Sequence, residues 1–404
     1  MKLSFLTKDF QITSKKFVAS TILTSGTLAW FFVVQVPLFN MSFQNYPNTL
    51  VPYLGPVLFY TFGAFSAVIG SLLGQKINSR KLLLFWITLG IIATASLAVS
   101  NELVAILSII LLGFSLGLGL PCCMAFVTQY TTVEERARVS GIVILQTFIM
   151  AFIATAVVTM LGIGLLGVII ISIAVRATSY LALAVDDCVR PQGKERSWSK
   201  VVVNKEFASY LLPWIIFNVV GSIAWWMIPS TSAYASFVAI GTAVRLACVA
   251  IFGLVAGVAA DYFGRKQSII IGLIVLGISF ELLGLAPSPT TVLIYLIMSG
   301  IVWGSFLAVY LAVPGDLAFS GSEEKFYALG AVVPLIIELG ISSITTIHLS
   351  PSQLSPILGI TLFLSIIPVL RARETLPEKK MEDRRFKEHL DRVGKLVKES
   401  KERS

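Results

Sequence analysis

Long apolar stretches alternate with short polar segments along almost the whole chain. An α-helix needs about 20 predominantly apolar residues to cross the hydrocarbon core of a bilayer, which is about 30 Å thick. Stretches of that length recur in both halves of the sequence. We therefore expect an all-α membrane protein with twelve transmembrane helices, over residues 17–39, 51–74, 82–100, 103–129, 140–160, 163–185, 207–229, 234–260, 268–286, 290–314, 326–348 and 355–370.

The composition agrees with this pattern and excludes a soluble domain. Of the 404 residues, 56% are hydrophobic and only 13% are charged, whereas soluble domains contain roughly 45–50% apolar and about 25% charged residues. The four cysteines include no CxxC pair, so neither a disulfide framework nor a zinc site is expected. The two histidines and the lack of a phosphate-binding loop argue against an enzyme, and no cofactor or metal is expected.

Lysine and arginine residues fall in alternate loops, which predicts the orientation of the chain. All but two of the 31 basic residues lie on the side of the two termini, and the exceptions, Arg176 and Arg245, lie inside predicted helices. Short loops rich in basic residues remain in the cytoplasm. We expect a plasma-membrane protein with both termini cytoplasmic, whose net charge of +9 reflects topology rather than nucleic-acid binding.

A polar link in the middle of the chain divides it into two sets of six predicted helices. The two sets are similar, because Glu134-Glu135-Arg136 in the first corresponds to Glu323-Glu324-Lys325 in the second, each followed five residues later by glycine. This repetition predicts two parallel bundles with a site between them. The expected organisation is a cytoplasmic N-terminus (1–16), a first bundle (17–189), a linker (190–206), a second bundle (207–371) and a basic tail (372–404).

The loop after the eighth predicted helix carries Gly257, Asp261, Gly264, Arg265 and Lys266. Its glycines permit close approach of two helix ends, and its aspartate can pair with the basic residues or accept backbone hydrogen bonds. This run resembles the GxxxDxxGRK signature of the major facilitator superfamily. The resemblance implies two six-helix bundles and a cytoplasmic gate at these residues, while a plain tight turn is the alternative interpretation.

The corresponding loop after the second predicted helix departs from that signature. Asn78 occupies the acidic position, and the glycine before the basic pair Arg80-Lys81 is missing. The resemblance nevertheless assigns Asn78, Arg80 and Arg136 to the gate. We expect the asparagine to weaken this half of it.

Ionisable residues within predicted helices require an explanation, because each costs about 2.5–3.5 kcal/mol or more near the bilayer midplane. Glu338 shares a helix face with Ser342 and Thr345, which makes it the candidate for proton coupling. An ion pair between Glu338 and Arg245 is the least costly way to hold both charges. A static structural pair is the alternative, and a structural role is favoured for Arg176.

The resemblance also implies that helices 1, 4, 7 and 10 line a central cavity, with help from 2, 5, 8 and 11. Aromatic side chains with a few amides suit an organic solute better than a bare ion. Ordinary packing is the alternative for each aromatic residue. The cavity candidates are Phe31, Gln35, Gln146, Asn218, Trp225, Trp303 and Tyr310.

Two short segments are similar to sugar and metabolite porters, namely the stretch leading to Gln146 and the run Arg373-Glu374-Thr375-Leu376-Pro377. Other signatures of sugar porters are missing, so the subfamily stays open. We expect a secondary transporter for a small organic solute, working by alternating access, with proton coupling through Glu338. The alternatives are an uncoupled facilitator or multidrug-type exporter, and a transport-inactive sensor or scaffold.

The expected partners are the solute, protons and the lipid bilayer, and the chain is expected to be a monomer. The tail carries apolar residues at helical spacing among many charges, which predicts an amphipathic helix on anionic lipid. A partly disordered, solvated tail is the alternative.

Overall fold

A computed structural model describes residues 10–188, 197–227, 235–286, 288–342 and 351–377. These ranges contain helices and no strands. The helices of the first half are α2 (Ser14–Val33), η1 (Val34–Leu38), α3 (Phe39–Gln44), α4 (Val51–Lys76), α5 (Ser79–Ser96), α6 (Glu102–Tyr130), α7 (Val133–Met160) and α8 (Leu165–Val185). Those that follow are α9 (Trp198–Val202), α10 (Lys205–Met227), α11 (Ala235–Phe263), α12 (Arg265–Leu285), α13 (Pro289–Leu317), α14 (Glu323–Ser342), α15 (Pro351–Leu364) and α16 (Ile366–Arg371).

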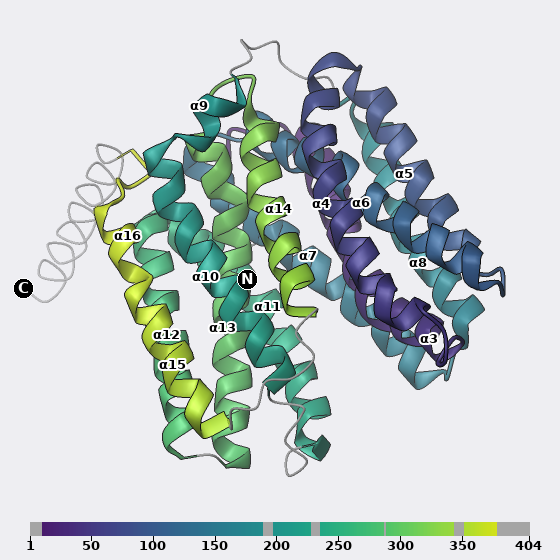
Figure 1. Cartoon of the computed structure of the whole chain (residues 1–404). Helices are drawn as coiled ribbons and strands as arrows, with labels where there is room; N and C mark the ends of the chain where they lie inside the picture. The colour runs from purple at the N-terminus through teal and green to yellow at the C-terminus, as the bar shows by residue number, and fades with distance from the viewer. Residues whose placement is uncertain (1–9, 189–196, 228–234, 287, 343–350, 378–404) are drawn as a thin grey trace, which may run out of the picture.

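The helices form two bundles that stand side by side (Figure 1). The first bundle contains α2 to α8, and the second contains α10 to α16. Two helix pairs make the main contacts across the boundary, namely α7 with α11 and α4 with α14. We call these pairs the α7–α11 seam and the α4–α14 seam.

Eleven helices in the described part of the chain are long and apolar enough to cross a membrane. Helix α14 is not among them, although it coincides with the first part of the eleventh predicted helix. Residues 343–350, which would complete that helix, lie outside the described ranges. An all-helical protein with many membrane helices is therefore confirmed, and the number twelve stays a prediction.

The first membrane helix is longer than its sequence pattern predicted. It continues through the π-helical turn η1 into α3 and ends at Gln44. Pro37 lies inside η1, and a proline cannot donate the backbone hydrogen bond that a regular α-helix requires. The wider turn extends the helix past the proline instead of ending it.

Close packing of small residues holds the helices within each bundle. A Cβ atom added to Gly117 in α6 would lie 1.9 Å from the carbonyl oxygen of Gly63 in α4, and one on Gly113 would lie 2.2 Å from that of Phe59. Lipid tails are as apolar as leucine, so membrane helices associate mainly through such packing and polar contacts. These glycines explain why α4 and α6 lie so close together.

The loops that follow α4, α6, α11 and α13 lie at one end of the molecule, which also carries α9 near the top of Figure 1. Local signals start the helices there. Asn78 accepts hydrogen bonds from the first backbone N–H groups of α5, and Thr132 forms a capping box with Glu135 at the start of α7. Gly264 has a φ of 109° between α11 and α12, which only glycine adopts readily. We call this end the charged end.

Candidate functional site

Asp316, near the end of α13, is the centre of a buried ion cluster at the charged end. Its Oδ1 lies 2.5 Å from Nη1 of Arg136, and its Oδ2 lies 3.1 Å from Nε of Arg265. The side chains of Asp316 and Arg265 are fully buried, and that of Arg136 is 6% exposed. Because Arg136 belongs to the first bundle and the other two to the second, the cluster joins the two bundles.

Asp261 forms a second link between the bundles. Its two carboxylate oxygens accept hydrogen bonds from the backbone N–H groups of Ala137 (3.2 Å) and Arg138 (2.8 Å) in α7. It also pairs with Arg265, whose Nη2 lies 2.8 Å from Oδ1, and with Nε of Arg138 at 3.2 Å. The structure thus brings together three residues that the sequence assigned to a gate, namely Arg136, Asp261 and Arg265.

Glycines bring the two helices of the α7–α11 seam into close contact. A Cβ atom on Gly257 would lie 2.3 Å from the carbonyl oxygen of Ala137 and 3.0 Å from Cα of Gly141. One on Gly141 would lie 2.7 Å from the carbonyl oxygen of Gly253. Only glycine permits this approach, which is what lets the Asp261 side chain reach the backbone of α7.

The segment after α16 joins the same cluster. Glu374 accepts hydrogen bonds from the backbone N–H groups of Arg265 (2.9 Å) and Lys266 (3.0 Å), where α12 begins. A carboxylate there satisfies free N–H groups and interacts favourably with the helix dipole. The Thr375 hydroxyl donates to Oδ2 of Asp316 at 3.0 Å. Nζ of Lys266 donates hydrogen bonds to the carbonyl oxygens of Leu370 and Ala372 at the end of α16, and these bonds hold the segment in place.

The predicted gate residues of the α4–α5 loop have different surroundings. Asn78 is exposed and its side chain accepts hydrogen bonds from the backbone N–H groups of Arg80 and Lys81. Arg80 forms an ion pair with Asp187, and the two side chains are 45% and 74% exposed. The Asn78 cap lies at the start of α5, and the Arg80–Asp187 pair joins α5 to the segment just after α8. They do not extend the ion cluster.

Aromatic rings from both bundles meet in the middle of the molecule. Trp303 of α13 contacts Phe32 of α2 and Phe148 of α7, with ring centroids 5.7 and 5.6 Å apart. The guanidinium carbon of Arg245, in α11, lies 5.0 Å from the Trp303 ring centroid. We call these four residues the central cluster. Sequence reasoning identified Trp303 and Arg245 but missed both phenylalanines, since a phenylalanine among so many apolar residues carries no distinguishing signal.

Two predicted cavity residues of the first helix contact the first bundle. The ring of Phe31 stacks on Phe59 with centroids 6.3 Å apart, and Nε2 of Gln35 donates to the Tyr60 hydroxyl at 2.7 Å. Gln146 in α7 is half-buried, and its buried Oε1 accepts no hydrogen bond from the residues that the structure describes. A polar oxygen in that position can accept a hydrogen bond from a molecule that enters the site.

The predicted cavity residues of the second bundle are divided between satisfied contacts and undescribed positions. Nδ2 of Asn218 donates to the carbonyl oxygen of Trp214, one turn earlier in α10. The Tyr310 ring stacks on the Trp214 ring with centroids 4.6 Å apart. The side chains of Trp225 and Glu338 lie outside the described residues. The expected pair of Glu338 with Arg245 therefore stays a prediction.

Arg176, the other arginine within a predicted helix, is fully buried inside the first bundle. Its guanidinium carbon lies 4.1 Å from the Trp86 ring centroid and 4.6 Å from that of Trp30. Nη1 donates to the Thr27 hydroxyl at 2.9 Å. No carboxylate among the described residues pairs with it. Two indole faces and a hydroxyl thus hold this cation within the packing of one bundle.

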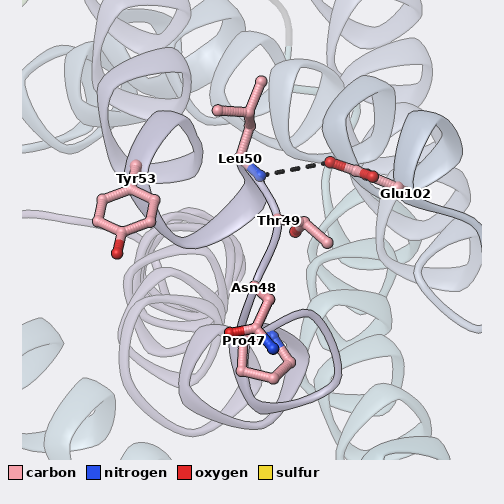
Figure 2. A pocket seen from close by; sticks show the side chains of 6 residues that line it. All are labelled: Pro47, Asn48, Thr49, Leu50, Tyr53 and Glu102. Atoms are coloured by element: carbon pink, nitrogen blue, oxygen red, sulfur yellow. Dashed lines mark hydrogen bonds between the residues drawn. The ribbon is translucent and has the colours of Figure 1, made fainter.

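A polar hollow of about 490 Å³ lies at the opposite end of the molecule. Figure 2 shows its lining, in which Oε1 of Glu102 accepts a hydrogen bond of 3.3 Å from the backbone N–H of Leu50. The hollow is open and formed by the first bundle alone, so it does not qualify as a site between the bundles. Its lining consists of Pro47, Asn48, Thr49, Leu50, Tyr53 and Glu102.

Comparison with known proteins identifies the fold. No protein-family model matches the sequence, and no curated protein is similar enough to match it. Solved structures do match along most of the chain. The human organic anion transporter MFSD10 (TETRAN) is 10% identical with a TM-score of 0.69, and the match covers 88% of this chain and 99% of that one.

Two further structures give the same result. FucP, a major facilitator superfamily transporter in the outward conformation, is 13% identical with a TM-score of 0.71 over 89% of this chain and 100% of its own. A bacterial homologue of the iron transporter ferroportin, in an outward-facing state, is 14% identical with a TM-score of 0.66 over 89% and 98%. This chain therefore has the fold of major facilitator superfamily transporters, as its loop signature predicted.

Proposed function

We propose that the protein is a secondary transporter that moves a small organic solute across the plasma membrane by alternating access. In this proposal the described conformation is closed at the charged end, and that end faces the cytoplasm. The observation that carries the proposal is the ion cluster around Asp316, because it connects the two bundles at the charged end of the molecule.

The physical chemistry of the cluster suits a gate. Removing one partner from a buried ion pair costs about 3–5 kcal/mol when the other charge stays in an apolar environment. When the bundles separate, however, water enters and solvates all the charged groups at once. Arg136, Asp261, Arg265 and Asp316 would then lose their contacts at a much smaller cost. Such a cluster stabilises the closed state without preventing the open one.

Proton coupling through Glu338 is the second part of the proposal. FucP, which has the same fold, is described as a fucose:proton symporter. A carboxyl group in a membrane helix gains and loses protons as its surroundings change between apolar and polar. We expect Glu338→Gln to abolish pH-driven accumulation while solute exchange continues. Uptake driven by a proton gradient at the wild-type rate in this variant would reject the role of Glu338.

Two other classes of function remain as alternatives. Measuring solute uptake with and without a pH gradient also separates these from the proposed one. An uncoupled facilitator or multidrug-type exporter would move solute without any response to a pH gradient. A transport-inactive sensor or scaffold would move none. Residues 378–404, most of the predicted basic tail (372–404), lie outside the described residues. The binding of this tail to anionic lipid and the monomeric state of the chain remain proposals as well.

The central test measures opening at the charged end. Lys81 in α5 and Gln267 in α12 are exposed and belong to different bundles, so spin labels on cysteines placed there report their separation. The native cysteines are first replaced by alanine. We expect two populations of label distance, with Asp316→Asn increasing the longer one. A single unchanged distance in all variants and with every solute tested would contradict alternating access.

A further inference from the structure

Arg245 stands out among the charged residues because it lies in α11, a helix of the α7–α11 seam, over a tryptophan ring that contacts rings of the first bundle. It is half-buried in the middle of α11, and its guanidinium group lies over the ring of Trp303. Along the described parts of α2, α7, α11 and α13, between the charged end and the opposite end, it is the single charged side chain. A cation in the membrane interior facing the centre of a bundle marks a substrate pathway more often than a packing site.

The Trp303 ring next to Arg245 contacts two rings of the first bundle. Phe32 and Phe148 lie edge-on or tilted to Trp303 and to one another, with centroid distances between 4.8 and 5.7 Å. Rings in such arrangements offer both faces and edges to a flat apolar group. The central cluster therefore combines one guanidinium group with an apolar, aromatic wall that the two bundles share.

Arg176 shows what a structural arginine looks like in the same protein. It also lies over tryptophan rings, but it is fully buried within one bundle, and two indoles enclose it. Arg245 has one described tryptophan neighbour and is partly accessible. The two residues share their chemistry and differ in location, which makes Arg176 the natural control for Arg245.

From this geometry we infer that the solute is a small organic anion with a flat apolar body, and that Arg245 binds its acidic group. This inference rests on the proposed transport function. A guanidinium group binds a carboxylate through two parallel hydrogen bonds and can keep an aromatic ring against its face at the same time. The apolar body of the solute would contact Trp303, Phe32 and Phe148.

The test uses matched probes that differ only in charge. The full-length protein is purified in detergent, and its thermal unfolding is followed with phenylacetate, phenylacetamide and phenethylamine, and also with benzoate and indole-3-acetate. A ligand that binds the folded state raises the unfolding temperature with increasing concentration. We expect the carboxylates to raise it, the amide to do so much more weakly, and the amine not at all.

Substitutions then assign the binding to one arginine. Arg245→Gln should weaken carboxylate binding roughly 10- to 100-fold, the usual effect of losing hydrogen bonds to a charged group. Arg245→Lys should retain part of the affinity, because it keeps the charge but loses the planar fork. Arg176→Lys should lower the unfolding temperature of the free protein while the shift caused by carboxylates stays as in the wild type. If Arg245→Gln does not fold, Arg245→Lys and quenching of tryptophan fluorescence by the carboxylates carry the test.

Three results would overturn the inference. They are stabilisation by the amine or the amide equal to that by the carboxylate, wild-type carboxylate affinity in a folded Arg245 variant, and no shift with any of the three carboxylates. The proposed transport function fails separately: carboxylate binding without movement into liposomes would reject transport and leave the ligand class standing. Transport of the amine without carboxylate binding would support the transport function and reject the ligand class.

Discussion

The two seams between the bundles occupy corresponding places and differ in their chemistry. In the α7–α11 seam, a Cβ on Gly257 would collide with the backbone of α7. In the α4–α14 seam, a Cβ on the corresponding Gly74 would lie 3.8 Å from Cγ of Glu324, which is an ordinary contact. At these corresponding positions the first seam therefore depends on glycine for its closeness, whereas the second has room for a Cβ atom.

The turns next to these seams also differ, because the turn beside the α7–α11 seam is largely buried and linked to the other bundle, whereas the turn beside the α4–α14 seam is largely exposed. Arg265 follows Gly264, is fully buried and pairs with two carboxylates, whereas Arg80 follows Ser79, is 45% exposed and pairs with the exposed Asp187. Asp261 accepts hydrogen bonds from the other bundle, while the hydrogen bonds that Asn78 accepts from described residues come from α5, the helix that it caps. A repeated loop that loses its acidic residue and its glycine thus changes from a link between bundles into a helix cap.

The largest expected effect comes from removing the shared carboxylate of the ion cluster. Asp316→Asn leaves Arg136 and Arg265 without a counter-ion that both use, and should destabilise the closed charged end by about 3–5 kcal/mol. The label distance between positions 81 and 267 should lengthen. Asp187→Asn removes an exposed pair, worth about 0–1 kcal/mol, and should leave the distance unchanged. Equal effects of the two variants would show that the turns are not different.

A single methyl group tests the glycine contact in the α7–α11 seam. Gly257→Ala should cost about 1–3 kcal/mol, because the new Cβ meets backbone atoms that cannot move freely. The matched control is Gly330→Ala in α14, where the nearest atom would be Cγ of Pro314 at 3.8 Å. That variant should be neutral or more stable by about 0.5–1 kcal/mol, since alanine favours helix. Thermal unfolding in detergent measures both, and a greater loss in the Gly330 variant would contradict the comparison.

Of the two turns compared, the described part of the segment after α16 contacts the one between α11 and α12, so weakening this segment sharpens the comparison. Thr375→Val deletes the hydrogen bond to Asp316 and should weaken the closed state by about 1 kcal/mol. Thr375→Ser keeps the hydroxyl group and serves as the control. The fraction of molecules with the short label distance should fall for valine and remain for serine. If the fraction falls for serine and remains for valine, the methyl group rather than the hydrogen bond holds this segment.

The smallest effect is expected from restoring the acidic residue of the first loop. Asn78→Asp keeps a side chain that caps α5 well, at an exposed position, so stability should change by less than about 0.5 kcal/mol. Closure of the charged end should also stay the same, because a carboxylate alone does not supply the missing glycine. A clear shift of the label distances toward the closed state would show that the acidic residue by itself makes the link.

Much of the fold follows from the sequence. Long apolar stretches predict the helices, since a bilayer leaves few other ways to satisfy the backbone. The intact loop signature predicts Gly257, Asp261, Gly264 and Arg265 at a contact between bundles, and its degenerate copy predicts a weaker counterpart. Such inferences depend on residues that are close together in the chain. The structure places Asp261 and Arg265 at a contact between the bundles, and the gate role stays a prediction.

The remaining features depend on contacts between distant segments. Asp316 lies 180 residues from Arg136, and nothing near it in the chain says that two arginines will meet there. Likewise, the sequence favours a structural role for Arg176, but only the structure shows the contacts: Arg176 is enclosed within the first bundle, and Arg245 lies over Trp303, whose ring contacts rings of the first bundle.

The physical reason is that a hydrophobic pattern specifies which residues form a helix but hardly constrains its rotation and partners when nearly every face is apolar. Small residues and polar contacts set that rotation in a membrane. Local signals therefore determined the helices, the turns and the loop signature of this protein. The packing of helices from two bundles decided which charges and rings meet between them.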